Sequence, residues 1–196
     1  MTHGSRWAGL SQADRQAERR RLLVSAAFEL FGEHGEAGVT VRSTCRHSGL
    51  NTRYFYESFA DTDELLGATY DFVVSDMIVA LAAAMADLPD DRARLRAGIR
   101  AVLDFSSGDP RRGRILFTEA RTNPVLSARR SMIQEELRKS VLEEGPDAER
   151  PARIADRVGA AMYAGAMAEL AQQWLVGNLG TELDPVVDAA VTQWLP

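Results

Sequence analysis

The sequence predicts an all-α fold of about nine helices. Two observations support this prediction: apolar residues recur at helical spacing along most of the chain, and Gly, Pro and Asn interrupt that spacing at intervals of about one helix length. In the first long segment, for example, Leu23, Ala27, Leu30 and Phe31 recur at positions i, i+4, i+7 and i+8. No segment alternates apolar and polar residues as a half-buried strand does, so no sheet is expected.

The first 60 residues are expected to hold a polar, disordered arm and three helices that share one small domain. Gly35 is a natural stop for the first helix, and Thr40 and Asn51 are suitable N-caps for the other two. The expected segments are the arm 1–11, the helix Gln12–His34, and the short helices Val41–His47 and Thr52–Ser58, all but the arm within a domain 12–60.

The rest of the chain, 61–196, is expected to form a second, helical domain. Asp61, followed three residues later by Glu64, has the pattern of a capping box that opens its first helix. Breaks are expected at 106–109, 123–124, 145–146 and 180–184. Between these breaks the expected helices are Thr62–Leu88, Arg92–Phe105, Pro110–Arg121, Val125–Glu143, Glu149–Asn178 and Pro185–Leu195.

Composition places the chain among soluble globular proteins, since 45% of its residues are hydrophobic and 26% are charged. Its one cysteine, Cys45, excludes an internal disulfide and suits a reducing compartment. The sequence has no run of about 18 apolar residues, and its first ten residues lack the apolar region of a secretory signal. We therefore expect a cytoplasmic protein that does not enter a membrane.

Charge is distributed unevenly along the chain. The first 60 residues hold eight arginines and six acids, a net charge of +2, whereas the remainder has a net charge of −7. A slightly basic head on an acidic body suits contact with nucleic acid through the head alone, because phosphate neutralisation is local. The alternative is that the two parts differ by chance.

The two short helices, joined by a Gly-containing turn, form a candidate helix-turn-helix. In the second helix Phe55 and Phe59 lie four residues apart, so that together with Leu50 they can fasten the helix to the rest of the domain. Arg53 then points in nearly the opposite direction. An arginine can pair with O6 and N7 of guanine, so this two-sided helix is expected to read DNA.

Several short motifs extend this pattern over residues 22–66. They are A-x-x-L-F at 27–31, Gly35, Thr-Val-Arg at 40–42, Gly-Leu at 49–50, Phe-Tyr-x-x-Phe at 55–59 and an acidic helix start with Leu-Leu at 61–66. Taken together, these offsets resemble the N-terminal domain of the TetR (tetracycline-repressor) family. The chain departs from the usual pattern at Thr44, Cys45, Ser48 and Asn51, where size or capping ability is kept. Thr62 replaces a lysine that binds phosphate in many members, which puts one backbone contact in doubt.

The resemblance implies roles for particular residues of the helix-turn-helix. Arg42 and Tyr56 would hold phosphates or a base edge, while Thr52, Arg53 and Tyr54 would face bases. Thr40 would cap a helix whose N-terminal amides point at phosphate. The full DNA-binding set is Thr40, Arg42, Asn51, Thr52, Arg53, Tyr54 and Tyr56. The alternatives are an aromatic cluster packed in the core for the tyrosines and merely solvated charges for the two arginines.

Further basic residues precede the helix-turn-helix. The arm carries Arg6 and Trp7, and the helix after it carries Arg15 and the run 19–21 of three arginines. Such a segment can enter the minor groove, as basic arms of other DNA-binding folds do. A flexible tail followed by a solvated helix face is the alternative.

By resemblance, the second domain binds an effector and forms a homodimer. Its own sequence supports pairing, because Ala155, Gly159, Ala166 and Gly177 permit close helix packing and the last helix is strongly apolar. Two helices from each subunit would then form a four-helix bundle, and the two-fold symmetry would match a palindromic DNA site. The alternative is that these segments pack inside the monomer.

The effector cavity is expected among apolar and aromatic side chains of the second domain, which favours an apolar or aromatic small molecule. No cofactor or metal ion is expected. An ordinary hydrophobic core is the alternative interpretation of the same residues. The candidates are Phe72, Met77, Phe105, Phe117, Met162, Tyr163, Met167 and Trp174.

The sequence therefore predicts a ligand-responsive transcriptional regulator: a repressor that binds double-stranded DNA at a palindromic operator as a dimer and is released by a small effector. An enzyme is not expected, because the sequence has no Gly-rich phosphate loop, no G-x-S-x-G and no H-E-x-x-H. Cys45 and His47 lie two apart on a helix and so point away from one another. The alternative is a helical ligand-binding or adaptor protein that keeps a vestigial DNA-binding head.

Overall fold

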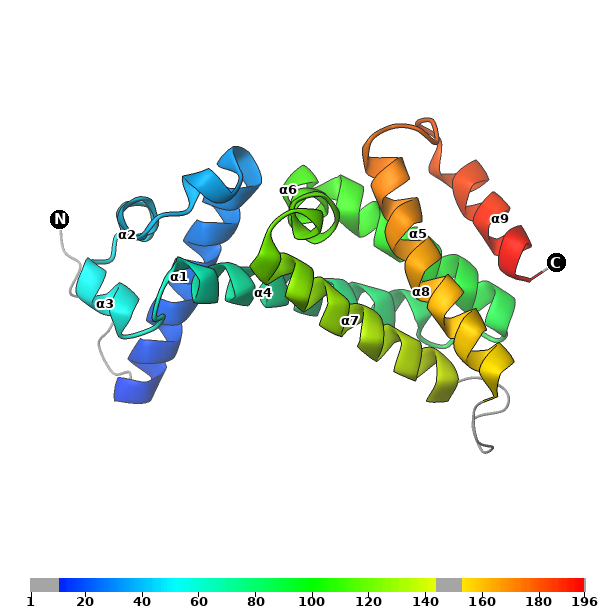
Figure 1. Cartoon of the computed structure of the whole chain (residues 1–196), viewed down its shortest axis with the longest axis horizontal. Coiled ribbons are helices and arrows are strands. Elements are labelled where there is room, and N and C mark those ends of the chain that lie inside the picture. The colour runs from blue at the N-terminus through cyan, green and yellow to red at the C-terminus, as the bar shows by residue number, and fades with distance from the viewer. Residues whose placement is uncertain (1–10, 144–152, 196) are drawn as a thin grey trace. The chain divides into compact units, whose positions relative to one another are not determined.

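The computed structural model describes residues 11–143 and 153–195. Within these ranges the chain forms helices and no strands, which confirms the all-α prediction. The chain divides into two compact units, Met1–Phe72 and Val73–Pro196, so the division falls inside a helix rather than at residue 61 (Figure 1). The arm expected at 1–11, apart from Ser11, and the break expected at 145–146 lie outside the described residues.

The first unit consists of three helices and the beginning of a fourth, packed around one small core. Helix α1 begins with a capping box in which the Ser11 hydroxyl accepts from the amide of Asp14. The core contains Leu23 and Phe31 of α1, which recur at the helical spacing seen in the sequence. The elements are α1 (Gln12–His34), the 3-10 turn η1 (Glu36–Gly38), α2 (Val41–Ser48), α3 (Thr52–Tyr56) and the start of α4 (Thr62–Met85).

Helix α4 is the most apolar helix of the described chain. By length and composition alone it could cross a membrane. Its N-terminal half, however, is an ordinary core helix, because Leu65, Leu66, Tyr70 and Val73 are buried against protein. The helix runs without interruption from the first unit into the second.

The second unit packs α5, α8 and α9 around a common core, with α7 alongside α8 (Figure 1). Ile99 and Leu103 of α5, Met167 of α8, and Val187 and Val191 of α9 meet there. These two valines are therefore core residues of the monomer, as the alternative interpretation of the last helix requires. The elements are α5 (Asp91–Gly108), α6 (Pro110–Gly113), η2 (Arg114–Thr118), η3 (Glu119–Arg121), α7 (Pro124–Glu143), α8 (Ile154–Leu175) and α9 (Leu183–Trp194).

The break expected at 106–109 is wrong for its first three residues, since α5 continues to Gly108. The hydroxyls of Ser106 and Ser107 donate to the carbonyl oxygens of Val102 and Leu103 at 2.6 and 2.7 Å, so neither serine needs to leave the helix to satisfy its hydroxyl group. Gly177, expected on the α8 face, lies beyond the end of that helix with a φ of 78°.

The helix expected at 110–121 is helical but irregular. Its middle, η2, is a π-helical turn, and η3 is a 3-10 turn. The buried residues of this segment are Ile115 and Leu116 in the π turn and Ala120 in the 3-10 turn. Both irregular turns therefore contribute buried side chains.

Two glycines of the second unit should respond oppositely to substitution by alanine. A Cβ atom at Gly113 would lie 2.6 Å from a methyl group of Leu175 and 2.7 Å from the carbonyl oxygen of Ser106, whereas one at Gly108 would meet nothing within 4 Å. Gly113→Ala should lower the free energy of unfolding by about 1–3 kcal/mol through overpacking. Gly108→Ala, the matched control, should leave it unchanged or raise it by up to about 1 kcal/mol. Urea unfolding followed by circular dichroism measures both, and equal effects would contradict the packing described.

Candidate nucleic-acid interface

The five-residue helix α3 is held from behind by two phenylalanines. Phe55 and Phe59 are both buried, with ring centroids 6.0 Å apart, while Leu50 is only partly buried. A helix of this length has no stability of its own, because helix nucleation is unfavourable and few bonds follow it. The two buried rings therefore fix where α3 lies and which of its sides faces solvent.

The opposite side of α3 is open to solvent. Thr52 and Arg53 are exposed, and the Arg53 side chain is 84% accessible. Tyr56 is 62% accessible, so it does not belong to a packed aromatic core, although its ring lies edge-on to that of Phe55. Tyr54 is half-buried. The solvent-facing side of α3 thus carries hydroxyl and guanidinium groups, while the opposite side holds the helix in the core.

Two side-chain caps shape the helix-turn-helix. The Thr40 hydroxyl accepts from the amide of Ser43 at 3.1 Å, and the Ser43 hydroxyl accepts in return from the amide of Thr40 at 2.9 Å. The side-chain oxygen of Asn51 accepts from the amide of Tyr54 at 3.1 Å and so opens α3. Between these caps Gly49 has a φ of 70°, which favours glycine, and it ends α2.

Helix α2 also has two distinct sides. Thr44 and Cys45 are buried, and burial raises the pKa of the Cys45 thiol, which keeps it protonated. Arg42 and Arg46 are exposed. His47 lies 2.6 Å from a carboxylate oxygen of Glu29 on α1, so this histidine joins two helices.

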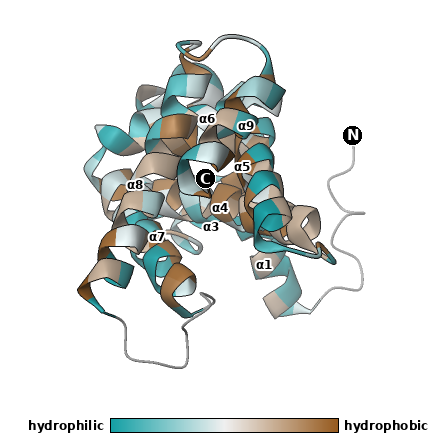
Figure 2. Ribbon diagram, turned by 90° about the vertical axis from the view of Figure 1, so that its right-hand side faces the viewer, coloured by the Kyte–Doolittle hydropathy of each residue, from teal (hydrophilic) through white to brown (hydrophobic). Residues whose placement is uncertain are grey.

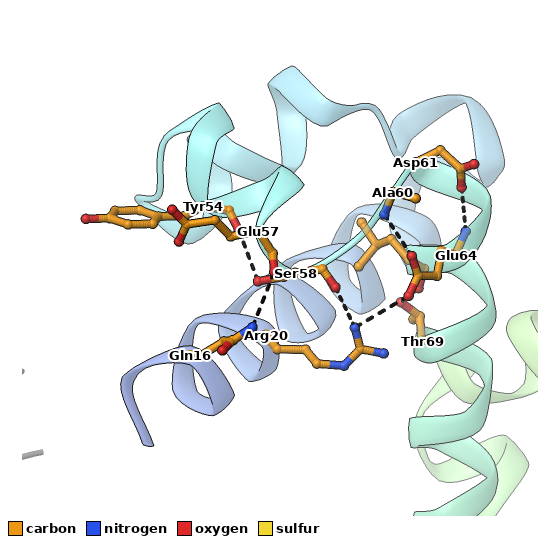
Figure 3. A network of polar contacts seen from close by, with 10 residues as sticks. Gln16, Arg20, Tyr54, Glu57, Ser58, Ala60, Asp61, Glu64 and Thr69 are labelled. Carbon is orange, nitrogen blue, oxygen red and sulfur yellow. Dashed lines mark hydrogen bonds and ion pairs between the residues drawn. The ribbon is translucent and has the colours of Figure 1, made fainter. Parts of the chain in front are cut away.

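Helix α1 holds the C-terminal end of α3 by polar contacts that the sequence pattern did not predict (Figure 3). Arg20 donates from Nη1 to the carbonyl oxygen of Ser58 at 2.8 Å, and the side-chain amide of Gln16 donates to the carbonyl oxygen of Glu57 at 3.4 Å. Arg20 also lies over the ring of Phe59, 4.1 Å from its centroid. These partners are about forty residues apart in sequence, and no local spacing signals them. Arg20 therefore contacts groups of the protein and is not merely solvated.

The start of α4 completes this corner of the domain (Figure 3). The Asp61 carboxylate accepts from the amide of Glu64 at 2.8 Å, as the capping pattern predicts. The Glu64 carboxylate accepts from the amide of Ala60 at 2.7 Å, one residue earlier than in the usual capping box. Both bonds fix the turn that links α3 to α4.

Four of the eight candidate effector residues, Phe117, Tyr163, Met167 and Trp174, belong to the core of the second unit or pack against it. Of the others, Phe105 faces the guanidinium of Arg112, Met77 is half-buried on α4 and Met162 is exposed on α8. Phe72 belongs to the first unit, where its ring lies edge-on to that of Phe28.

Comparison with known proteins agrees with this architecture. Residues 23–69 match the family model described as bacterial regulatory proteins, tetR family. The transcriptional activator FasR of Mycolicibacterium smegmatis is 26% identical over 180 residues, which cover 89% of this chain and 80% of that protein. The regulator BetI of Burkholderia thailandensis is 37% identical over 89 residues, 44% of this chain and 45% of BetI, so this chain spans less than half of BetI in that match.

The fold is shared over nearly the whole chain with solved regulators. FadR of Bacillus subtilis superposes with a TM-score of 0.71 at 16% identity, covering 89% of this chain and 97% of that one. The matched family and the relatives consist of transcriptional regulators rather than enzymes, in agreement with the expectation from the sequence. The helix-turn-helix and its two-sided second helix agree with these likenesses: residues 23–69 match the TetR family model, and over most of its length the chain is similar to a transcriptional regulator.

Proposed function

We propose that the chain is a ligand-responsive repressor that binds a palindromic operator as a homodimer. The observation that carries this proposal is the division of α3 into a buried side, Phe55, and an exposed side, Thr52, Arg53 and Tyr56. A helix anchored in this way can enter the major groove while its anchor remains in the protein. We also propose that the protein acts in the cytoplasm, where its DNA target lies.

Different parts of the head have different tasks in this proposal. Arg53, with Thr52 and Tyr54 beside it, contacts base edges in the major groove. Arg42 and Tyr56 contact phosphates and set the register of the protein on the duplex. Thr40 and Asn51 contribute as caps, because each helix start that they fix presents backbone amides. Release of counterions by the arginines makes binding dependent on salt.

The dimer interface in this proposal is the exposed face of α8. Ile154, Val158 and Met162 on this face are 73%, 51% and 62% accessible, which leaves a large apolar area in water. Ala161, Gly165 and Ala166 lie on the same face, and a Cβ atom at Gly165 would meet nothing within 4 Å. A stripe of small residues flanked by larger apolar ones permits two helices to approach closely and bury that area.

The effector in this proposal has an apolar body and at least one hydrogen-bonding group. Phe117, Tyr163 and Trp174 supply apolar surface, as ligand cavities require. Trp174 Nε1 and Gln172 Oε1 are buried and have no hydrogen-bond partner within the described ranges, so each is available to a ligand. The FadR structure from Bacillus subtilis is a complex with stearoyl-CoA, a molecule with a long apolar chain.

Repression is the regulatory direction that we propose, because a dimer seated on an operator excludes other proteins from that DNA. FasR is described as an activator. A reporter gene behind the native promoter decides the direction: deleting the regulator should raise expression, and a fall would reverse this part of the proposal.

The base-reading role of Arg53 predicts a specific loss. Arg53→Ala should weaken binding to the operator by about 1–3 kcal/mol and relax the preference at one base pair of each half-site. Arg42→Ala, the comparison variant, should weaken binding to every sequence alike and reduce the dependence of affinity on salt by about one ion. Gel-shift titrations on operator and scrambled duplexes measure both. Weak, sequence-independent binding by the unmodified protein would favour the adaptor alternative.

The dimer proposal predicts that a charge on the α8 face separates the subunits. Met162→Glu should convert the dimer to a monomer and lower operator affinity by at least about tenfold, since a monomer engages only one half-site. Met132 of α7, which is also 62% accessible, provides the matched control, and Met132→Glu should change neither property. Analytical ultracentrifugation gives the oligomeric state. A dimer that survives Met162→Glu would place the interface elsewhere.

The effector proposal is tested with stearoyl-CoA as the probe. Binding should be detected by calorimetry and should release the protein from its operator. Trp174→Phe keeps an aromatic ring but removes the N–H group, so it should weaken binding of the probe about 3- to 10-fold, the effect of one hydrogen bond. Trp7→Phe, a change outside the described residues, controls for the loss of an indole. The absence of any stearoyl-CoA binding would exclude this class of effector.

A further inference from the structure

One carboxylate in the head lies between two arginines from different helices. Oε1 of Glu57 is 2.9 Å from Nε of Arg53, and Oε2 of the same group is 3.5 Å from Nη2 of Arg19. Arg19 in turn lies over the ring of Tyr54, with its guanidinium carbon 4.4 Å from the ring centroid. A connected set of contacts thus joins α1 to the two side chains proposed to face bases.

Arg19 does not behave as a surface arginine. Its side chain is only 17% accessible, and its Nε is buried without a hydrogen-bond partner in the described part of the chain. A partly desolvated guanidinium interacts more strongly with a carboxylate and with an aromatic face than one in bulk water does. The position of Arg19 is therefore held by Glu57 and Tyr54, and it constrains both of them in return.

The contact of Arg53 with Glu57 does not use the atoms of Arg53 that would pair with a base. The contact with Glu57 uses Nε, whereas pairing with O6 and N7 of guanine can be made by the two terminal Nη groups. A long, 84% accessible side chain has many rotamers, and fixing one of them reduces the entropy lost on binding. An exposed ion pair of this kind adds little to the stability of the folded protein. The effect of the Arg53–Glu57 pair is therefore to orient the Arg53 side chain.

We propose that Arg19 and Glu57 are positioning residues that orient Arg53 and Tyr54 and thereby determine how strictly the recognition helix discriminates between bases. This inference rests on the proposed function, because it assumes that Arg53 and Tyr54 face DNA. It assigns Arg19 a role within the protein, distinct from entry into the minor groove.

The charge of Glu57 provides a readout that a merely structural role would not produce. A carboxylate near DNA repels phosphates, so its removal should leave unchanged or tighten binding to a scrambled duplex. Loss of orientation should at the same time weaken discrimination at the base pair read by Arg53. In Glu57→Ala, affinity for the scrambled duplex should therefore stay the same or rise, while discrimination between base pairs should fall.

The experiment selects binding sites from a pool of duplexes with a random core and sequences the bound fraction. The unmodified protein, Arg19→Ala, Arg19→Lys, Glu57→Ala and Glu57→Gln are compared with Arg21→Ala. Arg21 belongs to the same helix, but it forms an ion pair with Glu18 on that helix, at 2.7 Å. Affinities are then measured for the selected duplex, for the same duplex with one base pair changed, and for a scrambled duplex.

The unmodified protein should prefer its base at the Arg53 position by about 5- to 150-fold, the range of one bidentate contact. Arg19→Ala and Glu57→Ala should each reduce that preference about 3- to 10-fold. Glu57→Gln should restore part of it, because the amide oxygen still accepts from Arg53. Arg19→Lys should not, since an ammonium lacks the planar fork and stacks less well. Arg21→Ala should keep the preference ratio, whatever it does to overall affinity.

An equal loss of affinity for all three duplexes in Arg19→Ala and Glu57→Ala, with the ratio unchanged, would overturn the inference and leave the proposed function standing. Selection of no sequence by the unmodified protein would overturn both. Glu57→Ala carries the test if Arg19→Ala does not fold, because Glu57 lies on the surface; circular dichroism of each variant establishes folding.

Discussion

The burial of Phe55 and Phe59 is the constraint on which the head of the protein depends. A helix of five residues does not form alone, and its direction is set only by what lies beneath it. Phe55 lies on the helix and Phe59 follows its last residue by three positions, so burying both rings holds the helix and the turn after it against the core. With the helix held in this way, Arg53 and Tyr56 are exposed.

Local sequence patterns predicted most helix boundaries because their causes are local. The capping residues Thr40 and Asn51 act on amides three residues away, and Gly35 and Gly49 end helices through their own backbone conformation. The contacts that position α3 from α1 have a different origin. They join side chains of Gln16 and residues 19–20 to groups about forty positions away, and only the folded chain brings those groups together.

The irregular segment after α6 is a second feature that local sequence patterns do not predict. Spacing of apolar residues predicts a regular helix at 110–121, but residues 114–118 form a π turn and residues 119–121 a 3-10 turn. In the same region Gly113 lies close to Leu175 and to the carbonyl oxygen of Ser106. Leu175 is distant in sequence, so the local spacing of apolar residues cannot signal this close packing.

Helix α8 carries less information in its sequence than the helix-turn-helix does. The sequence predicts both Met162 and Met167 in an effector cavity, yet the first is exposed and the second is buried. In the proposed dimer, α8 packs inside its own subunit on one side and against the other subunit on the other, so both sides carry apolar residues and their spacing does not tell the two sides apart. The head escapes this ambiguity because DNA selects polar and basic side chains, which contrast with the core. A surface that binds a charged partner can therefore be predicted from the sequence. A surface that binds an apolar partner can be identified only when the structure shows which apolar residues are exposed and which are buried.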